Sequence, residues 1–141
     1  MIKKYLILFL LIGIVSGCAA TLATGPLFSE APPSTGNKST LYVFRTKSSW
    51  LAPKLTVKIN GKPLVALDSL GYSYAYLSPG IYRLTFDSGF ITEIEIKEGQ
   101  DLFVECHAAN GFGEGTRDVP KTQALDEIKN YRYVNPLNTI F

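Results

Sequence analysis

The feature that most constrains the fold is a regular succession of short β-rich runs separated by turn residues across residues 40–108. The runs are rich in β-branched and aromatic residues, as strands are. The clearest is KLTVKI at 54–59, in which three apolar residues alternate with polar ones. Such alternation indicates a strand with one buried face. Turn signals recur about every 8–12 residues, which is typical of an all-β sandwich.

The pattern predicts a small antiparallel β-sandwich of about seven strands. Asn60-Gly61 lies between two of the runs and is a strong hairpin signal, because both residues tolerate positive φ. Pro63 follows the turn and lacks a backbone N–H, which predicts an edge strand. The predicted strands cover residues 40–46, 54–59, 63–67, 72–77, 81–86, 90–96 and 101–108.

The C-terminal part predicts one short helix after a glycine-rich loop at 109–120. The sequence GFGEG within this loop is reminiscent of phosphate-binding loops, but those require a helix directly after the glycines. Here the helix, at 121–130, is expected only after Pro120. A helix of about ten residues is marginal alone in water, so it must pack on the sandwich. Residues 131–134 are a candidate last edge strand, and 135–141 form a tail.

The first residues have the character of a secretory signal. Lys3 and Lys4 precede an apolar run from Tyr5 to Val15 that is interrupted only by Gly13. A run of about 11 residues is too short to span a bilayer, which needs about 20. It has the length of the apolar region of a signal peptide.

The end of this leader, Val15-Ser16-Gly17-Cys18, resembles the lipobox of bacterial lipoproteins. The resemblance implies cleavage between Gly17 and Cys18 and diacylglycerylation of the Cys18 thiol. Two or three acyl chains anchor a protein stably at about 0.8 kcal/mol per buried CH₂. The alternatives are an ordinary cleaved signal that happens to contain a cysteine, or an uncleaved apolar anchor. Ala19 and Ala20, rather than Asp, follow the cysteine, which favours the outer membrane, facing the periplasm, in a Gram-negative cell.

This division predicts a signal peptide at 1–17, a lipidated N-terminus with a flexible spacer at 18–39, and a sandwich domain at 40–134. The spacer is rich in Ala, Thr, Ser, Gly and Pro and has no sustained period. A flexible chain of its length has a typical reach of roughly 25 Å. The alternative is that part of it packs along the domain, through Leu27 and Phe28.

Charge and cysteine content exclude several classes of function. The chain has 14 Lys and Arg against 12 Asp and Glu, and removal of Lys3 and Lys4 with the leader leaves 12 of each. A near-neutral domain has no electrostatic basis for binding nucleic acid. With Cys18 lipidated, Cys106 has no disulfide partner, and His107 is the only histidine. Metal sites built from several Cys or His residues are therefore excluded, and no cofactor is expected.

Residues 41–108 resemble a family of bacterial lipoprotein domains with no assigned function, and the related PEGA-type domains. The shared features are turn and strand motifs, and they imply an immunoglobulin-like or prealbumin-like sandwich without transferable catalytic residues. The motifs are the opening strand Leu41-Tyr42-Val43-Phe44-Arg45, the hairpin Ile59-Asn60-Gly61-Lys62, the aromatic strand Tyr72–Tyr76, and the turns Pro79-Gly80 and Glu98-Gly99-Gln100.

Aromatic residues are the candidate binding groups. Tyr72, Tyr74 and Tyr76 form a period-2 stripe on one strand face, which could stack against a glycan or a partner strand. The alternative is that the stripe packs in the core or under the C-terminal helix. Trp50, in the segment between two strands, is a candidate anchor if it is exposed. A tryptophan folded over the end of the sandwich is the more frequent arrangement.

Few residues suit catalysis. His107 and Glu105 share a strand face, but a general base needs a nucleophile or metal nearby and the sequence provides none. Cys106 points to the other face and is expected in the core. We therefore expect a non-catalytic interaction or structural module that binds another envelope protein or peptidoglycan. The alternative is a carbohydrate- or small-ligand-binding lipoprotein that uses the aromatic strand face.

Overall fold

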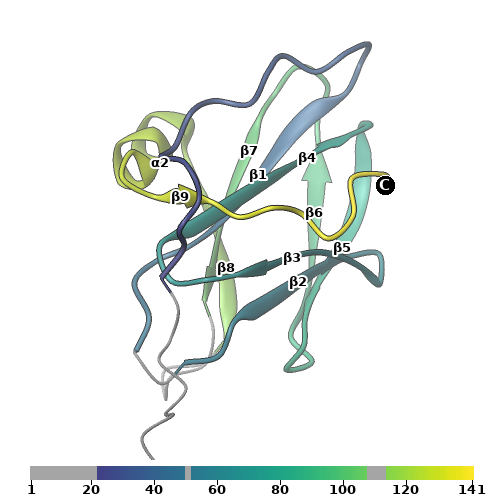
Figure 1. The fold of residues 1–141 in the computed structure, drawn as a ribbon. Helices are drawn as coiled ribbons and strands as arrows, with labels where there is room; N and C mark the ends of the chain where they lie inside the picture. Colours follow the sequence, from purple (N-terminus) through teal and green to yellow (C-terminus); the bar gives the residue numbers. More distant parts are fainter. Residues whose placement is uncertain (1–21, 50–51, 108–113) are drawn as a thin grey trace, which may run out of the picture.

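The computed structural model describes residues 22–49, 52–107 and 114–141, which form two stacked β-sheets and one short helix (Figure 1). The prediction of an all-β sandwich with one short C-terminal helix is confirmed. The strands are β1 (Ser39–Arg45), β2 (Leu55–Ile59), β3 (Lys62–Leu67), β4 (Gly71–Leu77), β5 (Gly80–Phe86), β6 (Ile91–Ile96), β7 (Leu102–His107), β8 (Gly115–Val119) and β9 (Arg132–Tyr133), and the helix is α2 (Lys121–Ile128).

One sheet has the strand order β8-β7-β1-β4-β9 and the other has the order β3-β2-β5-β6. The four-stranded sheet is antiparallel throughout. The five-stranded sheet is mixed, because β1 pairs with β7 and β4 pairs with β9 in parallel. The expectation of a purely antiparallel sandwich is therefore corrected. Parallel neighbours require long connections, and both parallel pairs join strands that are distant in sequence.

Local sequence chemistry explains most strand ends. Asn60 and Gly61 adopt positive φ values of 49° and 80°, the geometry of a tight hairpin turn between β2 and β3. Pro63 lies on β3, which is an edge strand. The loop predicted over 109–120 is wrong for residues 115–119, which form β8 against β7. The backbone of β7 supplies partners there, and Val119 at the end of β8 is buried.

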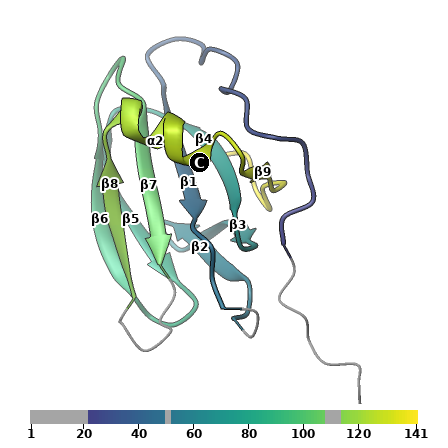
Figure 2. The same cartoon turned by 90° about the vertical axis from the view of Figure 1, so that its left-hand side faces the viewer.

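Two apolar layers hold the fold together. The first lies between the sheets and contains every second residue of the central strands. The second lies on the outer face of the five-stranded sheet, under α2, where Ala124 and Ile128 are fully buried against aromatic side chains. Figure 2 shows α2 crossing this outer face. We call the second layer the outer aromatic layer, and its buried members are Tyr42, Phe44, Tyr72, Phe103, Val119, Ala124, Ile128 and Tyr131.

The N-terminal segment 22–38 runs beside β9 and adds to the outer aromatic layer (Figure 2). The Phe28 N–H donates to Tyr131 O at 2.8 Å, and the Phe28 ring meets Tyr72 edge-on at 4.9 Å. The approach is so close that a Cβ on Gly25 would lie 2.0 Å from Tyr133 O. These contacts differ from the flexible spacer expected over 18–39, because Ala23 and Phe28 find apolar partners on the sheet.

The C-terminal tail 135–141 lies along β3. The Leu137 N–H donates to Leu64 O at 2.6 Å, and Asn138 Nδ2 donates to Pro63 O at 2.7 Å. Phe141 packs against the core, with Lys62 Nζ 5.6 Å from its ring centroid. The tail therefore occupies the outer edge of the strand that Pro63 begins.

Candidate functional site

The tyrosine stripe lies within the outer aromatic layer. Tyr72 is buried and contacts the Phe28 and Tyr133 rings. Tyr74 is half-buried between Tyr42, Tyr76 and Tyr133. The Tyr76 hydroxyl donates to Pro32 O at 2.7 Å in the N-terminal segment. The alternative interpretation, that the stripe packs within the fold, agrees with this placement.

Tyr42 is the centre of the same layer. Its ring stacks on Phe103 with a centroid distance of 4.4 Å and an angle of 2° between the rings. Its hydroxyl accepts a hydrogen bond from the Ala31 N–H at 2.9 Å. Burial raises the pKa of Tyr42 to about 12, although the bond from Ala31 lowers it. The phenol is thus a buried, neutral group at ordinary pH.

Three of the predicted site residues, Gly17, Cys18 and Trp50, lie outside the described residues. The structure therefore bears on neither the lipidation motif nor the Trp50 anchor. The glycines of the GFGEG sequence at positions 111 and 113 also lie outside them. Within the described ranges, no helix has the length and apolar character that crossing a membrane requires.

Glu105 and His107 do come together, but Glu105 is already engaged by an arginine. Glu105 is only 4% exposed, and Arg117 Nε donates to its Oε2 at 2.7 Å, with a second bond from Arg117 Nη2. Glu105 Oε1 lies 3.4 Å from His107 Nε2. Arg117 also reaches Glu127 on α2 at 3.4 Å. The hydrogen bond from Arg117 to Glu105 raises the pKa of the Arg117 guanidinium.

This network joins β7, β8 and α2, and it serves their packing better than it serves chemistry. Both carboxylate oxygens of Glu105 already have partners, Arg117 at Oε2 and His107 at Oε1. Among residues 22–49, 52–107 and 114–141 no group of acidic, His and Cys side chains has the arrangement of a metal site. Cys106 is fully buried in the layer between the sheets, and burial raises the pKa of its thiol. An inert core role for Cys106 fits this position.

Arg45 is a buried group that the sequence analysis did not single out. It is 2% exposed at the end of β1, and its Nη1 donates to Pro53 O at 2.7 Å and Leu67 O at 3.1 Å. Burial lowers the pKa of Arg45, while the charge of Asp68 raises it. The signal was present, since Arg45 continues the inward period of Leu41 and Val43 along β1. Its two backbone bonds tie β1 to the segment before β2 and to the end of β3.

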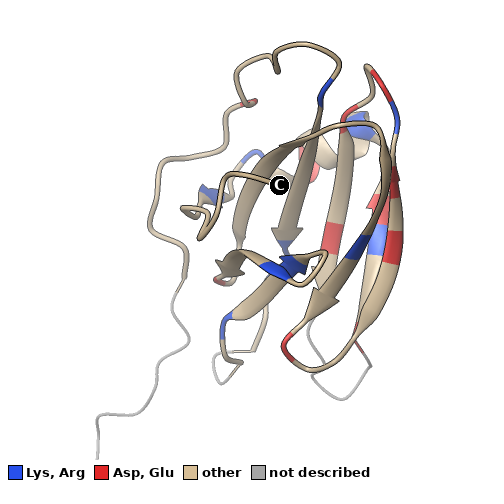
Figure 3. Ribbon diagram, turned by 90° about the vertical axis from the view of Figure 1, so that its right-hand side faces the viewer, with Lys and Arg blue, Asp and Glu red and all other residues tan. Residues whose placement is uncertain are grey.

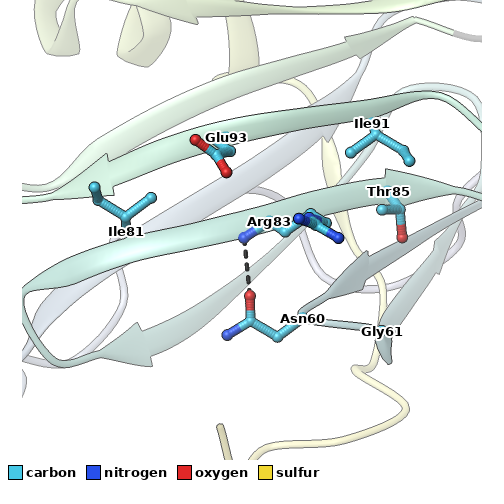
Figure 4. Close-up of a pocket in the computed structure, with 7 residues that line it drawn as sticks. All are labelled: Asn60, Gly61, Ile81, Arg83, Thr85, Ile91 and Glu93. Carbon is cyan, nitrogen blue, oxygen red and sulfur yellow. Dashed lines mark hydrogen bonds between the residues drawn. The ribbon is translucent and has the colours of Figure 1, made fainter.

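The outer face of the four-stranded sheet has a different character from the rest of the surface. Residues of β5, β6 and the turn between β2 and β3 line an open groove of about 560 Å³ (Figure 4). Ile81 and Ile91 are 70% and 59% exposed there. Asn60 closes one side, because its Oδ1 accepts from the Arg83 N–H at 2.8 Å. The lining residues are Asn60, Gly61, Ile81, Arg83, Thr85, Ile91 and Glu93.

Charge is divided across this face. Lys54, Lys58 and Lys62 lie on or next to β2 and β3, whereas Glu93 and Glu95 lie on β6 (Figure 3). Lys54 pairs with Asp68 at 3.5 Å and Lys58 pairs with Asp87 at 3.2 Å. Lysines therefore gather toward β2 and β3 on this face and glutamates on β6, with Arg83 of β5 opposite Glu93. This separation of charge was not predicted from the sequence.

Searches against protein-family models, curated protein sequences and solved structures find no match for this chain. The features of this chain that bear on function are therefore the leader sequence, the two layers of the fold and the charged outer face of the four-stranded sheet.

Proposed function

We propose that this chain is a lipid-anchored bacterial envelope lipoprotein whose β-sandwich is a non-catalytic interaction module. The lipid would be attached at Cys18, at the end of the leader whose basic, apolar and small-residue regions follow in the usual order. The domain would bind another envelope protein through the outer face of the four-stranded sheet. With Ala19 and Ala20 after the cysteine, the proposed location is the outer membrane, facing the periplasm.

The observation that supports this proposal best is the unequal covering of the two sheets. The outer face of the five-stranded sheet carries α2 and part of the N-terminal segment, and its aromatic side chains are buried or partly buried. The outer face of the four-stranded sheet instead exposes Ile81 and Ile91. Exposed apolar groups beside polar ones are typical of a protein-binding surface.

A protein partner is favoured over a glycan by the same surface. Glycan binding relies on exposed aromatic rings, and the tyrosine stripe is occupied by contacts within the chain. The open groove offers aliphatic and charged side chains, Ile81, Arg83 and Glu93 among them. These groups match a protein surface of complementary charge.

Photo-crosslinking in intact cells tests the binding surface. A photoreactive residue in place of Ile81 should yield a protein adduct of defined mass, and the same residue in place of Thr122, exposed on α2 over the other sheet, should not. Adducts at both positions would indicate unspecific proximity. The proposal fails if Ile81 yields no adduct, or if the adduct is a peptidoglycan fragment.

Metabolic labelling tests the anchor separately. A fatty-acid analogue should label the wild-type chain and fail to label Cys18→Ser, because the thiol is the acceptor. Cys106→Ser is the matched control and should retain the label, since Cys106 is buried in the core. Labelling that persists in Cys18→Ser would contradict the lipoprotein assignment.

A further inference from the structure

The two sheets have four edges, and among the described residues segments outside the sheets cover two of them. The β9 edge carries the N-terminal segment, where the Tyr133 N–H donates to Pro26 O at 2.8 Å. The β3 edge carries the C-terminal tail, through the bond from Leu137 to Leu64. The remaining edges, β6 and β8, lie on the other side of the sandwich (Figures 1 and 2). No strand of the described residues pairs with β6 other than β5.

The phase of hydrogen bonding on β5 shows which groups of β6 point outward. The Arg83 N–H and C=O both bond to Asn60, on the β2 side. The Phe86 N–H instead donates to Phe90 O, on the β6 side. In an antiparallel ladder the direction alternates with each residue. The backbone N–H and C=O groups of Thr92, Ile94 and Ile96 therefore point toward β5. Those of Ile91, Glu93 and Glu95 point to the open edge.

The side chains of the same three residues stand on the exposed outer face of the sheet. The edge thus combines unpaired backbone groups with one exposed isoleucine and two carboxylates. Glu95 has Lys97 at 3.8 Å, while no ion pair of the described residues engages Glu93. The surrounding sequence is acidic, since residues 91–119 hold 7 Asp and Glu against 2 Lys and Arg.

Space for an added strand is present at this edge. An open hollow of about 230 Å³ lies between the end of β6 and the strands β7 and β8, and Glu95, Leu102 and Asp118 are among its lining residues. The β6 and β8 edges therefore do not close on each other. A strand beside β6 would lie about 4.8 Å from it.

We propose that the β6 edge binds a basic, extended segment of a partner protein, which adds to the four-stranded sheet as a fifth strand. This inference rests on the proposed function and specifies the partner of the same sheet. Backbone bonds to Ile91, Glu93 and Glu95 supply affinity, and alternate side chains supply specificity, as in other strand-addition complexes. Lys or Arg opposite Glu93 and Glu95 forms cross-strand ion pairs.

Charge argues against a second copy of this chain as the occupant. Antiparallel pairing of two β6 strands would bring the carboxylates of Glu93 and Glu95 together, and like charges opposite each other are unfavourable. The β3 edge, which begins at Lys62 and contains Pro63, is occupied by the tail. The acidic residues on β6 also hinder unspecific edge association. A basic strand would pair with these carboxylates, so it could add to the edge where other strands are hindered.

A peptide of alternating Lys and Val, six residues long, is the probe for the full chain in detergent. We expect it to bind and to slow hydrogen exchange at the Ile91, Glu93 and Glu95 amides, with little change at Ile94, which is already bonded to β5. Alternating Glu and Val should not bind. The proposal is overturned if the basic peptide fails to bind, or if it binds without protecting these three amides.

Two pairs of variants separate the contribution of backbone hydrogen bonds to peptide binding from the contribution of charge. Ile91→Pro removes an outward N–H and keeps both carboxylates, so it should weaken peptide binding by about tenfold or more, whereas Ile91→Ala should bind nearly as wild type. The double change Glu93→Gln with Glu95→Gln should weaken binding by about threefold to tenfold. Glu98→Gln, in the following turn, is its control. Equal binding by Ile91→Pro and Ile91→Ala would overturn the strand-addition geometry.

Crosslinking at position 81 in Ile91 variants separates failure of the strand-addition proposal from failure of the proposed function. If the photoreactive residue at position 81 still captures its protein partner in an Ile91→Pro background, the sheet face binds and the edge does not. If capture is absent in the wild type as well, the proposed function itself fails. Loss of capture in Ile91→Pro, with capture retained in Ile91→Ala, supports both.

Discussion

The two sheets of this sandwich differ in how many of their faces are covered, and the sequence of each strand reflects the difference. In the five-stranded sheet, β1 is buried at all seven positions, because the core lies on one face and the outer aromatic layer on the other. In the four-stranded sheet, β6 alternates exposed glutamates with buried isoleucines. A strand that is covered on both faces uses all its side chains in packing. A strand that is covered on one face leaves the side chains of the other face available for binding.

The largest expected effect tests whether the outer aromatic layer is a true core. Phe103 is fully buried and stacked on Tyr42. Phe103→Ala should lower the free energy of unfolding by about 3–5 kcal/mol, because it removes a large buried ring and leaves a cavity. Urea denaturation of the full chain measures this. A loss below about 1 kcal/mol would show that the outer layer contributes little.

The next effect concerns pH. The pKa of Tyr42 is about 12 in the folded chain and near 10.0 when exposed. The folded state therefore holds this proton more tightly, and its contribution to stability is complete below pH 10 and is lost as pH rises toward 12. The loss is about 2–3 kcal/mol. Urea denaturation at stepwise higher pH should show a shallower decline for Tyr42→Phe, and an unchanged decline would contradict the assignment.

A smaller effect tests the N-terminal segment. Gly25→Ala places a methyl group against the Tyr133 carbonyl, so the segment must move away from β9. We expect faster hydrogen exchange at the Phe28 and Tyr133 amides and a loss of about 1–3 kcal/mol in unfolding free energy. Thr24→Ala, at an exposed neighbouring position, should change neither. Unchanged exchange in Gly25→Ala would show that this contact is not essential.

The smallest effect lies on the open sheet face. Ile81→Ser should change the free energy of unfolding by about 0.5 kcal/mol or less, because its side chain is largely exposed. Ile94→Ser, on the buried face of the neighbouring strand, is the contrasting variant and should be clearly destabilised. Thermal unfolding compares the two. A large loss in Ile81→Ser would mean that this face is part of the core and not a free surface.

Sequence periodicity predicted β1 to β7 because these strands carry their own alternation and turn residues. The Asn60-Gly61 turn and the edge position of Pro63 follow from local backbone chemistry, and both are present in the structure. β8 was missed because its sequence, Gly115–Val119, is polar and follows glycines, while its pairing partner β7 is visible only in three dimensions. The parallel pairs were missed for the same reason, since register between distant strands is not encoded locally.

The candidate surface was only partly predictable. The period-2 tyrosines were identified, but whether Tyr72 faces solvent depends on where residues 22–38 lie, and their composition gives no period. The open edge of β6 follows from the order of strands in the sheet, which the sequence of β6 does not reveal. Arg45 lies inward because it keeps the period of β1, against the usual preference of arginine for the surface.

The contacts of the N-terminal segment also limit the distance between the domain and a lipid attached at Cys18. The Ala23 N–H bonds to Ser69 O at the turn before β4, about five residues after Cys18. A fully extended chain spans at most about 3.6 Å per residue, so this end of the sandwich lies within about 18 Å of position 18. A lipid there would hold the domain close to the bilayer with the Ser69 end facing the lipid. β6 lies across the sandwich from the segment (Figure 2), so the proposed binding edge would be on the side of the domain away from the residues that lead to Cys18.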